Sequence, residues 1–409
     1  MRIVHRICCG LDVHKDEITA CLISKRERII KTFGTMTEDL LALLDWLLKA
    51  DCMHVAMEST GVYWKPVYNI LEAGGLQEIL VVNARDVKAV PGRKTDITDA
   101  EWIADLYRHG LLRGSFIPDR AQRELRELVR YRRSLIEEHS REVNRIQKVL
   151  EGANIKLGSV ATDVNGKSGR AIIEALIKGE TSVEAMADLA KGRLRNKMDL
   201  LKKSLNGLIG PHQRMLLEAQ RRHIDFLEEE IERLSKEIEA RMRPFDEAIE
   251  RLDEVPGLGR ISAEQVLCVI GLDMSRFPSS KHIASWVGLC PGNNESAGKR
   301  KSGKTRHGNQ MVKTTLIQAA QSIAHTRGNY LSAMYHRLAA RKGAKKAAVA
   351  VAHALLVIIY RMLKDGTRYK DLGGNFFDEL NKQAVVKRTV KRLEALGYKV
   401  TVEPTAPAA

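Results

Sequence analysis

The chain has 409 residues, of which 44% are hydrophobic, and its 67 Lys and Arg residues outnumber 51 Asp and Glu residues. This is the composition of a globular protein of two or three domains, and it excludes a wholly disordered chain and a small disulfide-stapled scaffold. The excess charge of +16 lies near one end, because residues 281–409 hold 23 Lys and Arg against 7 Asp and Glu. We expect a polyanion to bind this last third.

The chain carries no sign of secretion or membrane insertion. Its six cysteines form no CxxC pair and no zinc-ligand spacing, and the first residues, MRIVHRICCGLDVHK, contain no apolar signal-peptide stretch. The longest apolar run, residues 347–360, is shorter than the roughly 20 residues that cross a bilayer. We expect a reduced, cytoplasmic protein in which this run is a buried helix.

Residues 1–115 are predicted to form one α/β domain. Residues 6–33 contain three strand-like runs separated by short polar turns, which predicts an antiparallel meander. Helices and strands then alternate, so the later part of the sheet should be parallel. The expected elements are a helix from Thr37 to about Ala50, the strand MHVAMES, a helix over 63–73, the strand EILVVNA, and a helix from about Thr98 to Leu112.

Residues 116–245 are predicted to form long helices, the first over 119–150 and the second after Pro211. The second helix has a heptad seam with spacings of 7, 3, 4, 3 and 4, formed by Leu217, Ile224, Leu227, Ile231, Leu234 and Ile238. The first helix, a second chain of an oligomer, or both must cover this coiled-coil seam; the alternative is a lone amphipathic helix on a globular core. Glycines break residues 151–195 into an insert of short helices and loops, to which we assign no function.

Residues 246–375 are expected to form a further domain and residues 376–409 a basic tail. This domain contains VPGLGRISA at 255–263, a Gly/Pro/Ser/Lys-rich loop at 291–308, and three Ala-rich helical segments between Val312 and Leu363. The tail is mostly helical in character and ends in a loose Pro/Ala-rich stretch.

Four carboxylates in the first domain are candidates for a metal site. Asp12 and Glu58 follow apolar strands, where an acid is costly to bury without a partner. Asp96 and Asp99 are three residues apart at the start of a helix and project from one face. Taken alone, Asp96 could be an N-cap and Asp99 a helix-start acid. Together the four suit Mg²⁺ or Mn²⁺, and two such ions about 4 Å apart can support phosphodiester chemistry.

Three segments resemble a known family. GLDVHK, MESTGVYWKP and KTDITDAEWIA are similar to the acidic motifs of the DEDD transposases of the insertion-sequence one-ten family, whose relatives include the Piv-type DNA invertases. The resemblance implies a RuvC-like RNase H fold for the first domain, with Asp12, Glu58, Asp96 and Asp99 as a metal-binding tetrad. The segments VPGLGRISA and SWVGLCPGNNESAGKRKSGKTRHGN are similar to the second domain of that family. The similarity covers nearly the whole chain and is weak over 151–210.

The resemblance also implies a serine nucleophile. In this family it lies in the loop after the GLxP segment, and the matching residue is Ser296, with Ser302 as the rival. A serine that attacks a phosphodiester needs an exposed hydroxyl and nearby cations, although such a serine can also merely contact phosphate. Glu295 and His307 are more simply interpreted as solvated residues than as acid or base. The cations of the loop are Lys299, Arg300, Lys301, Lys304 and Arg306.

The segment VPGLG resembles the hairpin of a helix-hairpin-helix element. Gly257 and Gly259 would then let backbone N–H groups approach a nucleic-acid phosphate. An ordinary helix-helix turn with Pro and Gly is an equally good interpretation of these residues.

The resemblance implies a bacterial or archaeal, nucleoid-associated DNA transposase or recombinase of a mobile insertion sequence. Ser296 would attack DNA to form a phosphoserine link and a free 3′ hydroxyl, assisted by Mg²⁺ at the tetrad, in a dimer or tetramer. It further implies DNA partners and a structured bridge RNA as guide.

Other functions remain open at this stage. They are a metal-dependent nuclease or Holliday-junction resolvase, a DNA invertase without RNA guidance, a non-catalytic nucleic-acid-binding protein, and an ATPase of the actin and sugar-kinase type. The last would carry a Gly/Thr-rich phosphate loop where His14 and Lys15 follow Asp12, which counts against it.

Overall fold

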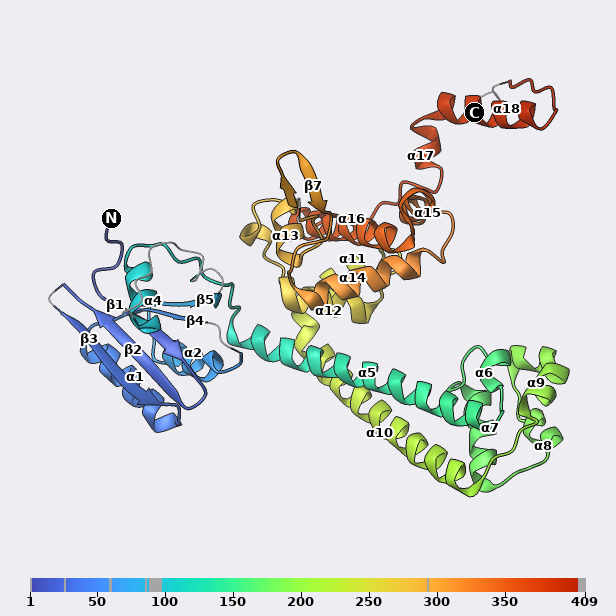
Figure 1. Ribbon diagram of the computed structural model, residues 1–409, viewed down its shortest axis with the longest axis horizontal. Coiled ribbons are helices and arrows are strands. Elements are labelled where there is room, and N and C mark those ends of the chain that lie inside the picture. Colours follow the sequence, from blue (N-terminus) through green and yellow to red (C-terminus); the bar gives the residue numbers. More distant parts are fainter. Residues whose placement is uncertain are drawn as a thin grey trace. The chain divides into compact units, whose positions relative to one another are not determined.

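The computed structural model describes residues 2–25, 27–58, 61–84, 87, 98–292 and 294–403, and for residues 294–296, 300 and 301 it describes the backbone alone. The chain divides into two compact units, Met1–Asp119 and Arg120–Ala409 (Figure 1). Each unit has its own cores, so each is described separately.

The first unit is built on a five-stranded mixed sheet with strand order β3-β2-β1-β4-β5. The first three strands form the expected antiparallel meander, and β4 and β5 run parallel to β1. The strands are β1 Cys8–Val13, β2 Glu17–Ile23, β3 Arg28–Gly34, β4 His54–Glu58 and β5 Glu78–Val82. The predicted mixed α/β architecture of this unit is therefore confirmed.

Helices cover both faces of this sheet. α1 (Thr37–Lys49) and α2 (Trp64–Ala73) pack on one face, where Leu11 and Met57 point into a shared core. α4 (Asp99–Arg108) packs on the other face, over a second core that includes Cys8 and Ala56. Because side chains alternate along a strand, each residue of β1 and β4 can be assigned to one of these two faces.

The second unit begins with two long helices that lie side by side, α5 (Arg120–Gly152) and α10 (Pro211–Met242) (Figure 1). Five of the six seam residues are buried: Leu217 and Ile224 belong to one core, and Leu227, Leu234 and Ile238 to another, against which Ile231 packs. Of the coverings that the sequence left open, the first long helix therefore packs along the seam. A coiled coil with a second chain stays a prediction.

A cluster of short helices follows α5, as expected for residues 151–195. These helices pack against α5 and α10, with Ile172, Ile173 and Leu201 in one core with Ile146 and Leu217. The elements are α6 Leu157–Val160, α7 Lys167–Lys178, α8 Val183–Asp188, η1 Gly192–Lys197 and α9 Met198–Leu205. The insert is therefore a small helical body whose core it shares with α5 and α10.

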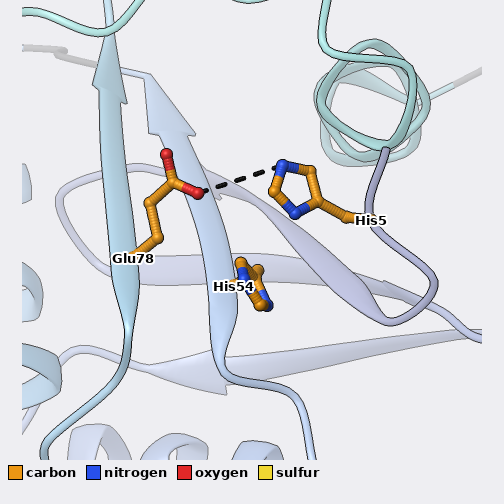
Figure 2. Close-up of side chains that lie close together, drawn as sticks. All are labelled: His5, His54 and Glu78. Carbon is orange, nitrogen blue, oxygen red and sulfur yellow. Dashed lines mark ion pairs between the residues drawn. The ribbon is translucent and has the colours of Figure 1, made fainter. Parts of the chain in front are cut away.

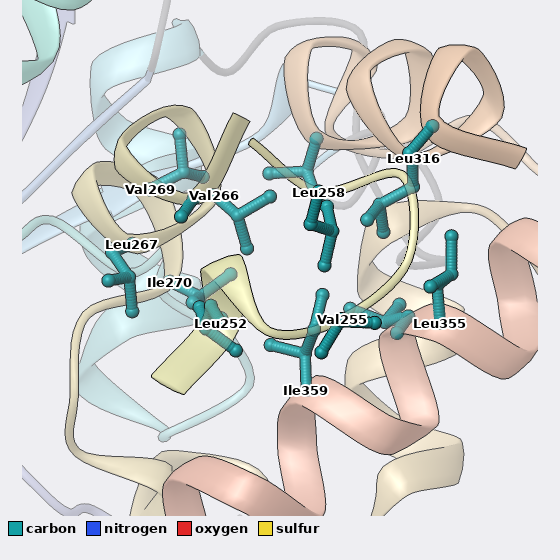
Figure 3. Close-up of a cluster of buried hydrophobic side chains, with 14 of the residues drawn as sticks. Leu252, Val255, Leu258, Val266, Leu267, Val269, Ile270, Leu316, Leu355 and Ile359 are labelled. Atoms are coloured by element: carbon teal, nitrogen blue, oxygen red, sulfur yellow. The ribbon is translucent and has the colours of Figure 1, made fainter. Parts of the chain in front are cut away.

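The rest of the second unit is mostly helical. Its core joins α11, α12, α14 and α16, and the side chains labelled in Figure 3 fill the space between them. The elements are η2 Arg243–Phe245, α11 Asp246–Asp253, α12 Arg260–Ile270, η3 Met274–Arg276, α13 Ser280–Val287, α14 Gln310–Ile323, α15 Tyr330–Lys342, α16 Ala344–Asp365, α17 Phe376–Glu379 and α18 Lys382–Ala395. α14, α15 and α16 are the three expected Ala-rich helices.

α16 is the one helix of the described chain whose length and composition would suit a membrane span. Half of its most apolar stretch is buried (50%), and Val351, Leu355 and Ile359 belong to the core of the unit. These contacts are those of the buried helix expected from the sequence.

One prediction about this unit is wrong. Within the segment expected to be a loop, β6 (Asn294–Ser296) and β7 (Lys299–Ser302) form an antiparallel hairpin. Its turn places Ala297 and Gly298 at φ of 50° and 73°. Two consecutive residues with positive φ are typical of a tight hairpin turn, but Asn-Gly and Asp-Gly are its usual sequence signals, and Ala-Gly is not.

Candidate active site

Asp12 and Glu58 are neighbours at the carboxyl ends of two adjacent strands. The parallel register pairs Leu11 of β1 with Met57 of β4, so the next residue on each strand is an acid. Adjacent strands lie roughly 4.8 Å apart, and register partners point to the same face. Because Leu11 and Met57 point toward α1 and α2, both acids belong to the face that α4 covers.

α4 runs back along β1, in the direction opposite to the strand. At the start of β1, the Cys8 thiol donates to the carbonyl oxygen of Ala104 at 3.7 Å. Two residues on, Gly10 lies so close to the helix that an added Cβ would be 2.4 Å from the carbonyl oxygen of Ala100. The end of β1, with Asp12, therefore lies toward the beginning of α4, where Asp99 is the first residue.

The amino-terminal cap of α4 is Thr98. Its hydroxyl accepts from the backbone N–H of Glu101, and the Glu101 carboxylate accepts in return from the Thr98 N–H. This bond from the Thr98 backbone lowers the pKa of the Glu101 carboxyl. The interpretation of Asp96 as the N-cap is therefore wrong, although Asp96 itself lies outside the described residues.

His14 is a polar neighbour that we did not select from the sequence as a site residue. Its Nε2 lies 3.2 Å from Asp12 Oδ2, with 58% of the His14 side chain and 20% of the Asp12 side chain exposed. The signal was present, since residues two apart on a strand share a face. Carboxylate oxygens such as those of Asp12, Glu58 and Asp99 are ligands that Mg²⁺ or Mn²⁺ prefers, but these three acids are not among the described ligand groups whose atoms all lie within 4.8 Å of one another.

The β6–β7 hairpin of the second unit is anchored firmly at its base. A Cβ on Gly308 would lie 2.4 Å from the backbone nitrogen of Gly288, so only glycines permit this approach. Above it, Gly292 N–H donates to the Lys304 carbonyl and Arg306 N–H to the Cys290 carbonyl. The hairpin therefore projects from a fixed platform formed after α13.

The two candidate serines lie on opposite strands of this hairpin. Ser296 ends β6 and pairs with Lys299 across the turn, and its side chain lies outside the described part. Ser302 ends β7, and its hydroxyl accepts from the backbone N–H of Lys304 at 3.2 Å. The structure therefore gives the backbone position of both serines and the contacts of Ser302 alone.

A pocket of about 960 Å³ opens beside Ser302, between the loop and helices α15 and α16. Apolar side chains form much of its wall, including Leu289, Met334, Leu338 and Val349. Four lysines also line it and are exposed: Lys304, Lys342, Lys345 and Lys346. An apolar wall with cations around it can hold a nucleotide, since a base is apolar on its faces and its phosphate is anionic.

The other predicted nucleic-acid contacts differ in their surroundings. Lys299 and Arg306 are exposed, whereas Arg300 and Lys301 are described only as backbone of β7. Gly259 is exposed before α12, with nothing within 4 Å of an added Cβ. At Gly257 an added Cβ would lie 2.7 Å from the Ala319 carbonyl oxygen, so this glycine also permits close packing against α14.

Residues 9–155 match a family model described as a transposase, and residues 249–336 match one described as the transposase IS116/IS110/IS902 family. The chain belongs to the IS110 family of transposases. The two matched segments contain the acidic site and the hairpin with its two serines, respectively. Residues 156–248, which include α10, lie between the two matches and outside both.

Several relatives resemble this IS110-family chain. A Sinorhizobium fredii protein named as a transposase, y4pF/y4sB, is 28% identical over 288 residues, which cover 69% of this chain and 65% of that protein. A Pseudomonas aeruginosa protein named as a family 20 transposase is 27% identical over 323 residues, covering 77% and 85%. A 43.6 kDa protein of insertion element IS110 from Streptomyces coelicolor is 32% identical over 123 residues, 29% of each chain.

Proposed function

We propose that this protein is a DNA transposase that cuts and rejoins DNA with a serine nucleophile and a metal-binding acidic site. The observation that carries the proposal is that Asp12 and Glu58 each directly follow the register pair Leu11–Met57 on β1 and β4. We propose that Asp99, the first residue of α4, joins them. Asp96 is the fourth proposed member. The strand order and the antiparallel meander that leads into parallel strands support a RuvC-like RNase H fold for this unit.

The proposed cofactor is Mg²⁺ or Mn²⁺, which would stabilise negative charge on the oxygens of the scissile phosphate. Asp12 and Glu58 would hold it, because carboxylate oxygens are the ligands that these ions prefer. Asp99 is exposed at the start of α4, where its side chain can turn toward an ion. His14 would orient Asp12 from the solvent side.

We propose Ser296 as the nucleophile and Ser302 as its rival. The serine oxygen forms a bond to the DNA phosphorus while the bond from phosphorus to the 3′ oxygen breaks. The hydroxyl proton leaves the serine, and the 3′ oxygen takes up a proton to become a free 3′ hydroxyl. Because the phosphoserine link keeps the phosphate esterified, the same bond can be reversed to rejoin DNA.

The proposed partners are the ends of the mobile element, its target DNA, and a structured guide RNA. The basic side chains around the hairpin and the lysines of the pocket beside it support binding to phosphates. We also propose a dimer or tetramer, in which a tetrad and a serine from different copies act on one phosphate.

The test is to incubate the full-length protein with Mg²⁺, element-end DNA and co-purified RNA, and to map any protein–DNA adduct to one residue. Ser296→Ala should abolish the adduct and strand transfer. Ser322→Ala, on the exposed side of α14, is the matched control and should leave both intact. An adduct that persists in Ser296→Ala and disappears in Ser302→Ala would move the nucleophile to Ser302.

The second candidate function is a metal-dependent nuclease or junction resolvase that cleaves by hydrolysis alone. The observation that favours it is the acidic site itself, since paired carboxylates with Mg²⁺ can direct water to a phosphodiester without a serine. In that case cleavage would survive replacement of both Ser296 and Ser302, and would be lost in Asp12→Asn. A DNA invertase without a guide RNA would instead keep the serine adduct after removal of the RNA.

A further inference from the structure

A second group of potential metal ligands lies at the other end of the same sheet. It consists of His5, before β1, His54, the first residue of β4, and Glu78, the first residue of β5 (Figure 2). One ligand atom from each lies within 4.8 Å of the other two. His5 Nε2 is 3.9 Å from Glu78 Oε2, and the centroids of the two imidazole rings are 4.6 Å apart.

The strand register brings these ligands together. His54 and Glu78 are direct partners in the parallel pairing of β4 and β5, so their side chains project to the same face. His5 reaches that face because the backbone N–H groups of Val4 and His5 both donate to the Arg108 carbonyl, at the end of α4. Three separated segments therefore meet at one point.

This point is separate from the acidic site. His54 and Glu58 are the first and last residues of β4, roughly 13 Å apart along a strand of this length. α4 spans the same interval, with Asp99 at its start and the Arg108 carbonyl at its end. A ligand at His54 would therefore be distinct from a metal ion at Asp12 and Glu58.

The side chains around these three residues are partly buried, which distinguishes the group from an ion pair on the protein surface. The His5 side chain is 15% exposed and its ring stacks on Tyr107, with centroids 4.5 Å apart. Tyr107 is 3% exposed, and its burial together with the nearby Glu78 carboxylate raises the pKa of its hydroxyl. The Tyr107 hydroxyl therefore faces the same carboxylate and can help to orient it.

We propose that His5, His54 and Glu78 bind one Zn²⁺ ion that fastens the amino-terminal segment to the sheet. Two imidazole nitrogens with one carboxylate oxygen favour Zn²⁺ over Mg²⁺, because Mg²⁺ prefers oxygen ligands alone. Tetrahedral Zn²⁺ holds such ligand atoms about 3.4 Å apart, so the ligands need only small side-chain rotations from their present positions. The ion would join the segment before β1, which is hydrogen-bonded to the end of α4, to the first residues of β4 and β5. It would thereby stabilise the sheet that carries the acids.

The experiment uses the full-length chain without a histidine tag, stripped of metal by a chelator. We expect calorimetric titration with Zn²⁺, and metal analysis after desalting, to give one bound ion per chain. Zn²⁺ should also raise the melting temperature, and Co²⁺ in its place should give the intense visible absorption of tetrahedral coordination. His54→Gln and Glu78→Gln should each weaken Zn²⁺ binding at least tenfold and remove the stabilisation.

Two controls make the result decisive. His336→Gln changes an exposed histidine on α15 and should bind Zn²⁺ like the unchanged chain. Asp12→Asn changes the acidic site and should also retain the ion. The Glu78 side chain is 44% exposed, so Glu78→Gln provides the test even if His54→Gln fails to fold. Failure of the unchanged chain to bind Zn²⁺, or equal binding by Glu78→Gln, would overturn the proposal, and neither result bears on DNA transfer.

Discussion

Gly10 sets how closely α4 approaches β1, and replacing it tests whether that approach builds the acidic site. In Gly10→Ala the new Cβ would lie 2.4 Å from both the Ala100 carbonyl oxygen and the Ala104 backbone nitrogen. Favourable contact between such atoms begins near 3.5 Å, so α4 must withdraw from the strand by about 1 Å. Overpacking of this kind costs about 1–3 kcal/mol of unfolding free energy.

The same displacement moves the start of α4 away from the strand ends. Asp99 would then lie farther from Asp12 and Glu58, and a misplacement of about 1 Å in catalytic machinery can cost on the order of 100-fold in rate. We therefore expect Gly10→Ala to weaken Mn²⁺ binding, measured by electron paramagnetic resonance, and to slow strand transfer more than its loss of stability explains.

Gly152→Ala is the matched control for this substitution. It makes the same change at the end of α5, where the nearest atom to an added Cβ is Gln213 Nε2 at 3.9 Å. Urea denaturation of both variants separates the local clash from the general effect of replacing glycine. If Gly10→Ala unfolds at the same urea concentration as the unchanged chain and transfers strands within twofold of it, the inferred role of α4 is wrong.

Three further predictions concern the second unit. Arg132→Met should lower the unfolding free energy measured in urea, because it removes the 2.7 Å buried partner of the Glu264 carboxylate. The loss should stay below the roughly 3–5 kcal/mol of a buried charge left without any partner, since Arg260 Nε remains 3.2 Å from Glu264 Oε1, and adding Glu264→Leu should recover part of it. Burial lowers the pKa of His353, so the folded state prefers the neutral ring. The stabilisation should be complete above pH 6.5, the ordinary pKa of histidine, and should be lost as the pH falls through the lowered pKa of the folded protein. Melting curves of His353→Gln should lack this acid-dependent loss, and an equal loss in both proteins would contradict the assignment. The double substitution Lys345→Gln and Lys346→Gln should weaken the salt dependence of DNA binding. The slope of the logarithm of the binding constant against the logarithm of the salt concentration should fall by about 0.9 for each phosphate that these lysines neutralise. An unchanged slope would mean that the DNA does not contact these lysines.

Much of the first unit follows from local sequence pattern. Apolar runs such as CCGLDV and HVAME alternate with polar turns or helical periodicity, and these patterns give both the meander and the later parallel strands. The helix expected to reach Leu112 ends at Arg108, since Gly110 adopts a φ of 68° just beyond it. Sequence therefore predicts the elements well and the helix end less well.

The sites were predictable only where chemistry coincides with strand ends. Asp12 and Glu58 stand out because each lies at or next to the end of an apolar strand, and parallel strands end at the same edge. No such signal marks His5, His54 and Glu78. The sequence around them shows no metal-ligand spacing, and His54 and Glu78 come together only because β4 pairs with β5. The β6–β7 hairpin was missed for a similar reason, since its Ala-Gly turn lacks a residue that favours positive φ.

The distribution of charge indicates different roles for the two units in the proposed reaction. Residues 281–409 carry the whole net positive charge, whereas residues 1–280 hold 44 basic and 44 acidic residues. A pair of carboxylates repels a phosphodiester, so the acidic site cannot attract DNA without its cation. The basic unit should therefore bind DNA without Mg²⁺, and the ion should be needed only for the chemical step. Asp12→Asn combined with Glu58→Gln should then abolish strand transfer and leave DNA affinity and its salt dependence unchanged, whereas a parallel loss of binding would mean that the acids and their ion also hold the DNA.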